Sequence, residues 1–208
     1  MTPPEPSVYP TISLTLTDLE QDSWQKLAAA LEGKKDMGFK TMTLACRTAN
    51  GADARTVVLR QVDVVRKYVW FHTDVRAAKV MQLEAFPDAT LLFWDDTQQI
   101  QLRLTVETRL HTNDYLADEQ WQTLGVGNRK NYLSEHKPGS VQPSPYPGFP
   151  THLGAGLPSL EESENGRDNF AAIECRVLTM DYLHLSRDGQ VRARFQYEPD
   201  SKMSWLAP

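Results

Sequence analysis

Two short runs decide how this chain folds: residues 55–60 are Arg-Thr-Val-Val-Leu-Arg, and residues 71–79 are Phe-His-Thr-Asp-Val-Arg-Ala-Ala-Lys. The first run centres on β-branched residues that favour a strand, and a polar turn leads from it to a second strand. After Asp74 the apolar residues recur at helical spacing until Pro87 ends the pattern. The sequence therefore predicts a hairpin whose second strand leads into a helix capped by Thr73 or Asp74.

Four cations mark these elements. Arg76 and Lys79 are three residues apart, so within the predicted helix they would share a face near its amino end, where free N–H groups and the dipole favour an anion such as phosphate. A solvated helix face is the ordinary alternative for such a pair. Arg55 and Arg60 point to opposite faces of an ideal strand, so either a bulge intervenes or they serve different neighbours.

The composition is that of an ordinary globular protein, with 208 residues, 40% of them hydrophobic and 24% charged, and we expect a single domain over residues 1–208. No apolar run approaches the roughly 20 residues that span a bilayer. A net charge of −5 disfavours nucleic acid as the main partner. Residues 1–6 lack the features of a signal peptide, which predicts a cytoplasmic protein. Cys46 and Cys175 lie in apolar strand patterns and are expected to be reduced core residues.

The rest of the chain alternates between strand and helix patterns. Strands are expected at 41–47, 90–94, 100–107, 169–177, 182–185 and 191–197. Asn50-Gly51 and Asp188-Gly189 are strong hairpin turns. Helices are expected after Asp18 or Asp22 with an end at Gly33, from Asn113, and around Tyr132. Short turns and few helices indicate a small antiparallel β-barrel.

Two segments fall outside this pattern. Residues 1–17 are rich in Pro and Thr and are predicted to form an extended amino-terminal arm. Residues 137–168 contain six of the 13 prolines and show no periodicity. They are predicted to form a long Pro-rich loop, which in a compact domain is usually functional or disordered.

Common catalytic motifs are missing, including a phosphate-binding glycine loop, His-Glu-x-x-His, Cys-x-x-Cys and Gly-x-Ser-x-Gly. The five histidines are scattered without metal-ligand spacing, so no metal is expected. What remains is a set of cations and amides on neighbouring elements: Arg55, Arg60, Arg76, Lys79, Gln101 and Arg194. Such a set suits a phosphorylated planar cofactor, because Arg contacts phosphate in a bidentate manner and Gln offers a donor and an acceptor to a heterocyclic ring.

At these residues the sequence resembles the pyridoxamine 5'-phosphate oxidase family, the flavin-binding split β-barrel. The resemblance rests on the order and spacing of Arg-x-Val-x-Leu-Arg, the aromatic-x-Thr pair, Arg-x-x-Lys, a later Pro, and Gln-hydrophobic-Arg at 101–103. It is good over residues 40–110 and weak at the carboxyl end, where Arg194-Phe195-x-Tyr197 and residues 205–208 are similar to the oxidase.

The resemblance implies a mainly β fold with flanking helices: an antiparallel split barrel of the Greek-key type. It also implies a homodimer that holds flavin mononucleotide (FMN) between its subunits. The cofactor-binding residues carried over by similarity are Arg55, Val57, Val58, Arg60, His72, Thr73, Arg76, Lys79, Gln101 and Arg194, with the two valines offering backbone groups. His72 stands in place of the more usual Tyr, and His184 lies near the place of the oxidase's late Trp.

Departures from the family pattern separate FMN binding from vitamin B6 chemistry. The Arg-x-His triplet that grips pyridoxal phosphate in true oxidases reads Gln190-Val191-Arg192 here, so Gln190 and Arg192 are the candidate substrate-binding residues. The expected function is an FMN-dependent oxidoreductase that acts on an unassigned small molecule through unassigned catalytic residues. The alternatives are a non-enzymatic flavin- or haem-binding module and a true pyridoxamine 5'-phosphate oxidase, and a deazaflavin could replace FMN.

Overall fold

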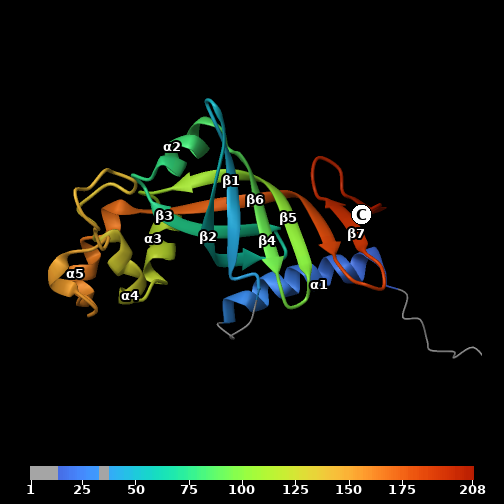
Figure 1. Ribbon diagram of the computed structural model, residues 1–208, viewed down its shortest axis with the longest axis horizontal. Helices are drawn as coiled ribbons and strands as arrows, with labels where there is room; N and C mark the ends of the chain where they lie inside the picture. Colours follow the sequence, from blue (N-terminus) through green and yellow to red (C-terminus); the bar gives the residue numbers. More distant parts are fainter. Residues whose placement is uncertain (1–13, 33–37) are drawn as a thin grey trace, which may run out of the picture.

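Antiparallel strands form one continuous sheet that curls and closes on itself in the computed structural model, which describes residues 14–32 and 38–208 (Figure 1). The strand order is β3-β2-β1-β4-β5-β6-β7-β8, and an additional β3–β6 pairing closes the first six into a barrel. The order of β1 to β4 is that of a Greek key. The strands are β1 Thr41–Thr48, β2 Gly51–Asp63, β3 Tyr68–Asp74, β4 Asp88–Asp95, β5 Ile100–His111, β6 Phe170–His184, β7 Val191–Gln196 and β8 Lys202–Leu206.

Buried apolar side chains alternate with outward-facing side chains along the strands, and the apolar side chains fill the barrel. In β5 the side chains of Ile100, Leu102, Leu104 and Val106 are buried, while the residues between them face outward. Two helices cover opposite ends of this core: α1 (Leu16–Ala29) and α2 (Ala78–Ala85) (Figure 1). Trp24, from α1, is fully buried in the core.

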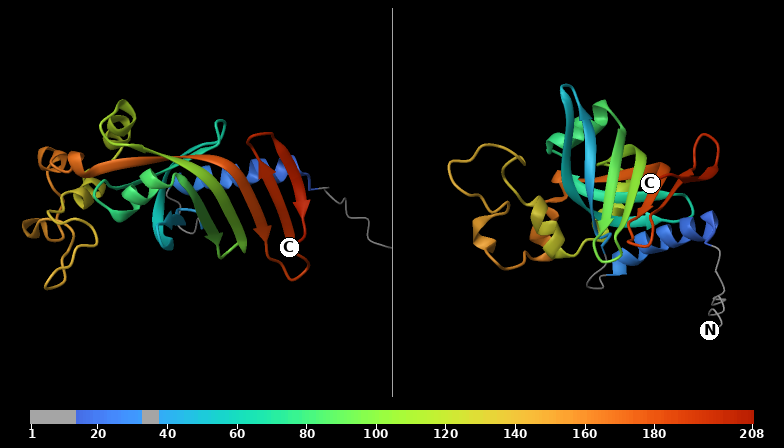
Figure 2. Two further views of the ribbon diagram at one scale, coloured as in Figure 1. Left: turned by 90° about the horizontal axis from the view of Figure 1, so that it is seen from above. Right: turned by 45° about the vertical axis from the view of Figure 1, so that its right-hand side comes forward.

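A second aromatic cluster lies outside the barrel wall formed by β3 and β6. It joins Trp70 and Phe170 of those strands to Trp121 and Tyr132 of the helical segment that follows β5. Three short helices build this side of the molecule: α3 (Tyr115–Gln122), α4 (Val126–Arg129) and α5 (Leu160–Glu164) (Figure 2). A glutamate from α5, Glu164, accepts hydrogen bonds from the Trp121 indole and from Arg129, which fixes the helices to one another.

Two β-bulges shape the sheet. The register between β2 and β3 shifts between Leu59 and Gln61, so Arg60 is the extra residue. The register between β5 and β6 shifts between Thr105 and Val106, opposite Leu178. The sequence left open whether a bulge separates Arg55 from Arg60. A bulge does occur, at Arg60 itself.

The antiparallel Greek-key barrel with flanking helices is confirmed, and several boundaries are corrected. Helix α1 begins at Leu16 because the Thr15 side chain caps it, two or more residues earlier than predicted. The two strands predicted at 169–177 and 182–185 are one strand, β6, because the bulge interrupts the alternation without ending the pairing. Strand β8 was not predicted. The predicted arm lies mostly outside the described residues, as does Gly33.

The segment 137–168 is less irregular than predicted. It contains α5 and the 3₁₀ turns Thr151–Leu153 and Arg167–Asn169. The buried Lys130 ammonium anchors it by donating to the carbonyl oxygens of Gly154 and Gly156 at 2.6 and 2.7 Å. A lysine from the preceding helical segment thus fixes the middle of this segment. None of the helices in the described ranges is long and apolar enough to cross a membrane.

The contact between α1 and the carboxyl-terminal region depends on one hydroxyl group. Tyr197 accepts a hydrogen bond from the Trp24 indole at 2.8 Å and donates to Glu20 at 3.0 Å. We expect Tyr197→Phe to lower the free energy of unfolding by about 1 to 2 kcal/mol, because two buried polar groups lose a partner. Urea unfolding measures this, with Tyr115→Phe as the control, since that side chain is 78% exposed. Equal effects of the two substitutions would contradict the assigned role.

Candidate functional site

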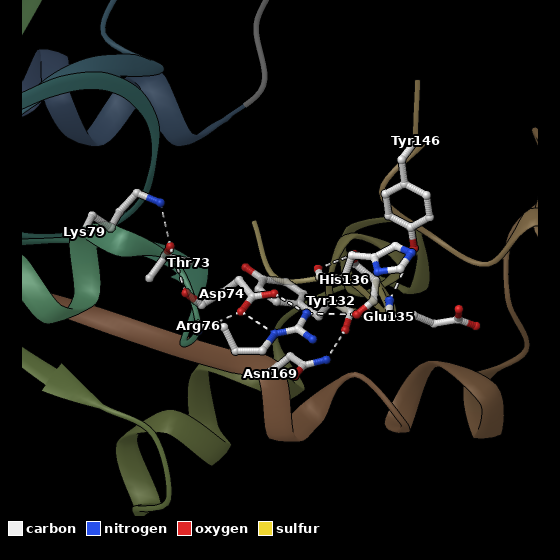
Figure 3. A network of polar contacts seen from close by, with 10 residues as sticks. Thr73, Asp74, Arg76, Lys79, Tyr132, Glu135, His136, Tyr146 and Asn169 are labelled. Atoms are coloured by element: carbon white, nitrogen blue, oxygen red, sulfur yellow. Dashed lines mark hydrogen bonds and ion pairs between the residues drawn. The ribbon is translucent and has the colours of Figure 1, made fainter. Parts of the chain in front are cut away.

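A cationic corner lies where β3 ends and α2 begins. The Lys79 ammonium donates to the Thr73 hydroxyl at 2.9 Å (Figure 3). Arg55 of β2 is close enough to act on the charge of Lys79. Burial, followed by the neighbouring guanidinium, lowers the pKa of Lys79 below its usual value. We call Arg55, Thr73 and Lys79 the phosphate corner.

Arg55 is held in this corner from three sides. Its guanidinium donates to the Cys46 sulfur at 2.9 Å and to the Gln82 amide oxygen at 2.9 Å, and it forms an ion pair with Asp53. Burial raises the pKa of the Cys46 thiol despite the nearby arginine, which keeps the sulfur protonated at neutral pH. Both cysteines are buried and free, as predicted.

The start of α2 has no side-chain cap. Its N-cap residue is Ala77, which has no side chain to accept from the first N–H groups. A helix start without a side-chain cap, a lysine, an arginine and a hydroxyl form the kind of donor set that binds phosphate. The chemistry of this corner therefore fits the phosphate group of a nucleotide cofactor.

Arg76 does not share a helix face with Lys79, so that prediction is wrong. The helix begins two residues later than Arg76, because the Asp74 carboxylate accepts the Arg76 backbone N–H at 2.8 Å and forms a local turn in its place. The same carboxylate binds the Arg76 guanidinium at 2.7 Å, and the Ser134 carbonyl accepts from it at 2.9 Å. Figure 3 shows Arg76 turned toward Asp74 and the later loops, on the other side of Thr73 from Lys79.

The bulged Arg60 stands apart from the phosphate corner. Its charge acts on His72 and Tyr132, and it makes no hydrogen bond or ion pair with any residue of the described ranges. Arg55 and Arg60 therefore serve different neighbours, in addition to being separated by a bulge. A partly buried guanidinium without a carboxylate partner is suited to a ligand with acceptor atoms.

His72 is neutral and has an unused acceptor. The Gln120 amide donates its N–H to Gln61, so its oxygen must accept from His72 Nε2 at 3.0 Å. This assignment leaves Nδ1 as a buried acceptor without a partner in the described part of the chain. Burial, helped by Arg60 and opposed by the bond to Gln120, lowers the pKa of His72 to about 4.

The split in the barrel exposes one edge of β2. Pairing with β3 starts at Leu59, so residues 51–58 have β1 on one side and no strand of the described residues on the other. The Leu59 N–H donates to the Lys40 carbonyl, and the alternation that follows directs the backbone groups of Val57 toward β1 and those of Val58 toward the open edge. Of the two predicted valines, Val58 is the one whose backbone groups are free for a ligand.

The remaining predicted residues lie in a different part of the sheet. Gln101 and Arg192 align with Leu183 across β5, β6 and β7, and Arg194 occupies the next row of the same outward face. Gln190 is exposed in the turn before β7, and His184 pairs with Ile100 and Val191 near the end of β6.

Within one chain these residues are far from the phosphate corner. Thr73 pairs with Ala171, whereas Gln101 pairs with Leu183, twelve residues further along β6. At about 3.3 Å per residue the strand covers about 40 Å between these two points. Figure 2 shows β6 running from the helical side of the molecule to the side of β7 and β8. One chain therefore does not bring all the predicted cofactor residues together.

Several neighbours of the site were not identified from the sequence. Gln82, which orients Arg55, lies one helical turn after Lys79, so its spacing on α2 was a usable signal. Gln120 and Asp181 form hydrogen bonds with residues of distant segments, so no local sequence pattern indicates their role. A cavity of about 370 Å³, lined by Asp74, Ser134, His136 and Tyr146 among others, adjoins Arg76. The described residues contain no cluster of His, Cys, Asp and Glu that could hold a metal ion.

Comparison with known proteins agrees with this geometry. Residues 21–112 match the family model described as pyridoxamine 5'-phosphate oxidase, FMN-binding domain. A pyridoxamine 5'-phosphate oxidase-related, FMN-binding protein from Nostoc punctiforme has a similar structure, with a TM-score of 0.68 and 19% identity, covering 95% of this chain and 100% of that one. PhzG from Burkholderia lata, solved with tetrahydrophenazine-1-carboxylic acid, gives 0.68 and 16%, covering 97% and 98%. A search of curated proteins finds no match.

The fold is that of the FMN-binding split barrels. Residues 21–112, somewhat less than half of the chain, match the FMN-binding domain model of the pyridoxamine 5'-phosphate oxidase family, and the cofactor of that domain is FMN. The family prediction from the sequence is confirmed.

The buried His72 makes stability depend on pH. An unfolded histidine takes up a proton near pH 6.5, whereas the native imidazole resists protonation until about pH 4. Between these values the unfolded chain binds more protons, so stability falls as the pH is lowered, by up to about 3 kcal/mol. Urea unfolding at pH 7.5, 6 and 5, buffer values chosen to bracket this window, measures the loss.

His72→Gln is the matched control, because its amide can still donate to Gln120 but does not titrate. We expect the variant to lose less stability on acidification than the unchanged protein. Parallel pH profiles would show that His72 does not resist protonation in the fold.

Proposed function

We propose that this protein is an FMN-dependent oxidoreductase that acts as a homodimer on a small organic molecule. The single observation that carries the proposal is the phosphate corner beside the open edge of β2. Arg55, Thr73 and Lys79 offer the charges and donors that a terminal phosphate requires, and the uncapped start of α2 adds backbone N–H groups.

The neighbouring groups have complementary roles in the proposal. Val58 offers its backbone at the open edge, and the partnerless Nδ1 of His72 offers an acceptor to a hydroxyl or N–H group. Arg60 supplies a positive charge that no described carboxylate neutralises. Arg76 holds the loop at Ser134 close to the corner. Bound FMN supplies the electron transfer, and the protein positions it and adjusts its charge.

A homodimer follows from the distance along β6. The phosphate corner and the Gln101–Arg194 face are too far apart in one chain to contact the same FMN molecule. A second copy related by a twofold axis can bring its Gln101 and Arg194 next to the first copy's phosphate corner, and the reverse contact then forms by symmetry. The predicted residues are compatible with one site only if two chains share it.

The substrate class is a small ring compound. PhzG, with the same fold, was solved with tetrahydrophenazine-1-carboxylic acid, which is a compound of this kind. The polar lining of the cavity beside Arg76 and the outward face of β5 to β7 both suit such a molecule.

A non-enzymatic flavin-binding module is the second candidate. One observation favours it: of the acidic and neutral ionisable groups described around the corner, Asp53 and Asp74 are held in ion pairs, and Cys46 and His72 are kept neutral by burial, so none of these four is poised for proton transfer. Oxidation of a nicotinamide or of pyridoxamine 5'-phosphate by the FMN-loaded protein separates the two candidates. Turnover supports the enzyme, and a flavin that is reduced only by dithionite supports the module.

Removal of either corner cation should weaken cofactor binding. We expect Arg55→Ala and Lys79→Ala each to weaken FMN binding by about tenfold to a hundredfold, because a charge-assisted phosphate contact is worth about 1.5 to 3 kcal/mol. Fluorescence quenching of FMN measures the dissociation constant. Arg66→Ala is the control, because this exposed arginine only stacks over Tyr68. Unchanged binding in a folded Lys79→Ala protein would refute the phosphate corner.

Mixed dimers test whether two chains share the site. If Arg194 reaches FMN held by the other chain, mixing Lys79→Ala with Arg194→Ala subunits restores one intact site per mixed dimer, whereas neither variant alone has any. FMN binding after subunit exchange in mild urea measures the recovery. Lys79→Ala mixed with Arg55→Ala is the control, since both residues belong to one corner and no exchange can rebuild it. Failure of the first mixture to recover, with dimers present, would place Arg194 outside the site.

A further inference from the structure

One carboxylate on the outward face of the sheet is surrounded by three arginines. Asp181 of β6 accepts from Arg103 of β5 at 3.0 Å and from Arg192 of β7 at 3.1 Å through two nitrogens. Arg194, also of β7, approaches the same carboxylate at 3.4 Å. We call these four residues the arginine cluster. Its net charge is +2, because no other carboxylate of the described residues contacts the three guanidinium groups.

The strand register builds the cluster. Arg103, Asp181 and Arg194 face one another in a single row across β5, β6 and β7, and Arg192 lies one row away. The Asp181 side chain is only 5% exposed, while those of Arg103 and Arg194 are 44% and 48% exposed. The carboxylate is thus a buried anchor, and the charged ends of the arginines reach toward solvent.

Asp181 remains ionised in this setting. Burial on its own raises the pKa of a carboxyl group, but the hydrogen bond from Arg192 and the charges of Arg103 and Arg192 outweigh it, so the pKa of Asp181 lies below its usual range. The arginines together offer more N–H donors than one carboxylate can accept. Most of those donors have no protein partner within the described ranges.

Another arginine on the same strand shows the contrast. Arg176 of β6 lies on the same outward face and bonds to two carboxylates, Glu107 and Glu198. At Arg176 two carboxylates surround one guanidinium group, as in an ordinary ion-pair network on a protein surface. At Asp181 the ratio is reversed. The three guanidinium groups repel one another, and a bound anion would relieve that repulsion.

Three members of the cluster, Arg103, Asp181 and Arg194, also line a cavity of about 390 Å³, together with three threonines and Gln196. This volume lies within the range of small-ligand pockets. The threonine hydroxyls add neutral donors around the guanidinium groups. A flat organic acid with one anionic group matches both the volume and the donor set.

We propose that Arg103, Arg192 and Arg194, positioned by Asp181, form a binding site for the carboxylate or phosphate group of a small organic ligand. As the anchor for the substrate, this site rests on the proposed FMN oxidoreductase function; as an anion site it does not. Arg103 and Arg194 are the contact residues. Asp181 is a positioning residue that spaces the guanidinium groups.

Calorimetric titration of the FMN-loaded full chain tests the proposal with three probes: benzoate, phenyl phosphate and the neutral benzamide. We expect benzoate or phenyl phosphate to bind and benzamide not to. The preferred acid identifies whether the site takes a carboxylate or a phosphate. The titrations are repeated with Lys79→Ala, so that the phosphate corner does not contribute.

Arg103→Gln should weaken binding of the preferred acid about tenfold, the value of one charge-assisted hydrogen bond. Arg176→Gln, which removes the same charge from the same face, should leave it unchanged. Asp181→Asn adds a net positive charge, so a merely electrostatic patch would bind the acid more tightly. We expect weaker binding, because the guanidinium groups lose their common anchor.

The outcomes are separable from those of the FMN proposal. Acid binding that is equal in the unchanged protein and in Arg103→Gln overturns the anion site, whatever the protein does with FMN. Tighter binding by Asp181→Asn overturns the positioning role. A protein that fails to bind FMN but binds benzoate through Arg103 retains the anion site and loses only its assignment to a substrate.

Discussion

The pairing of β6 with two different neighbours on one of its edges determines the architecture. Its first half pairs with β3 and closes the barrel, whereas its second half pairs with β7 and extends the sheet beyond it. The change occurs at Leu178, where the Val177 N–H bonds to Lys67 and the Leu178 carbonyl accepts from Tyr197. A bulge at this point bends the strand and lets each half keep its own partner. One strand of 15 residues thus belongs to both the barrel and the outer sheet.

This double pairing also explains why the site is divided. Because β6 carries β3 at one end and β7 at the other, residues that follow β3 cannot approach residues on β7 within a single chain. The edge of β2 is open because β3 pairs with only the last part of β2. On its other edge β3 pairs with β6. A barrel split in this way leaves backbone donors and acceptors near the phosphate corner. The same constraint that closes the barrel therefore leaves the edge of β2 open and separates the two groups of predicted cofactor residues.

Local patterns in the sequence were sufficient for most strands. The alternation of β5 and the Asn50-Gly51 turn predicted their elements closely, because each depends on neighbouring residues alone. The start of α2 was missed because Asp74 uses its carboxylate to form a turn with Arg76 in place of capping the helix. The arginine cluster could not be predicted either. Its members lie up to 91 positions apart in the sequence, and only the register of β5 and β7 on β6 brings them together. Resemblance to a family suggested the cofactor residues, and by implying a homodimer with FMN between its subunits it also suggested that one chain would not bring all of them together.

The phosphate corner brings two positive charges close together. At the phosphate corner, Arg55 and Lys79 are held near each other in partial burial, and burial and the neighbouring guanidinium both lower the pKa of the lysine. Keeping two cations together costs free energy in the folded chain, and the ion pair of Asp53 with Arg55 and the charge of Asp74 near Lys79 offset only part of that cost, since the pKa of Lys79 is still lowered. A bound phosphate removes that cost and adds hydrogen bonds, so part of the free energy of binding comes from relieved repulsion. A ligand that binds only the folded chain stabilises it by mass action, so in the proposed function cofactor binding and folding are coupled through this pair of cations.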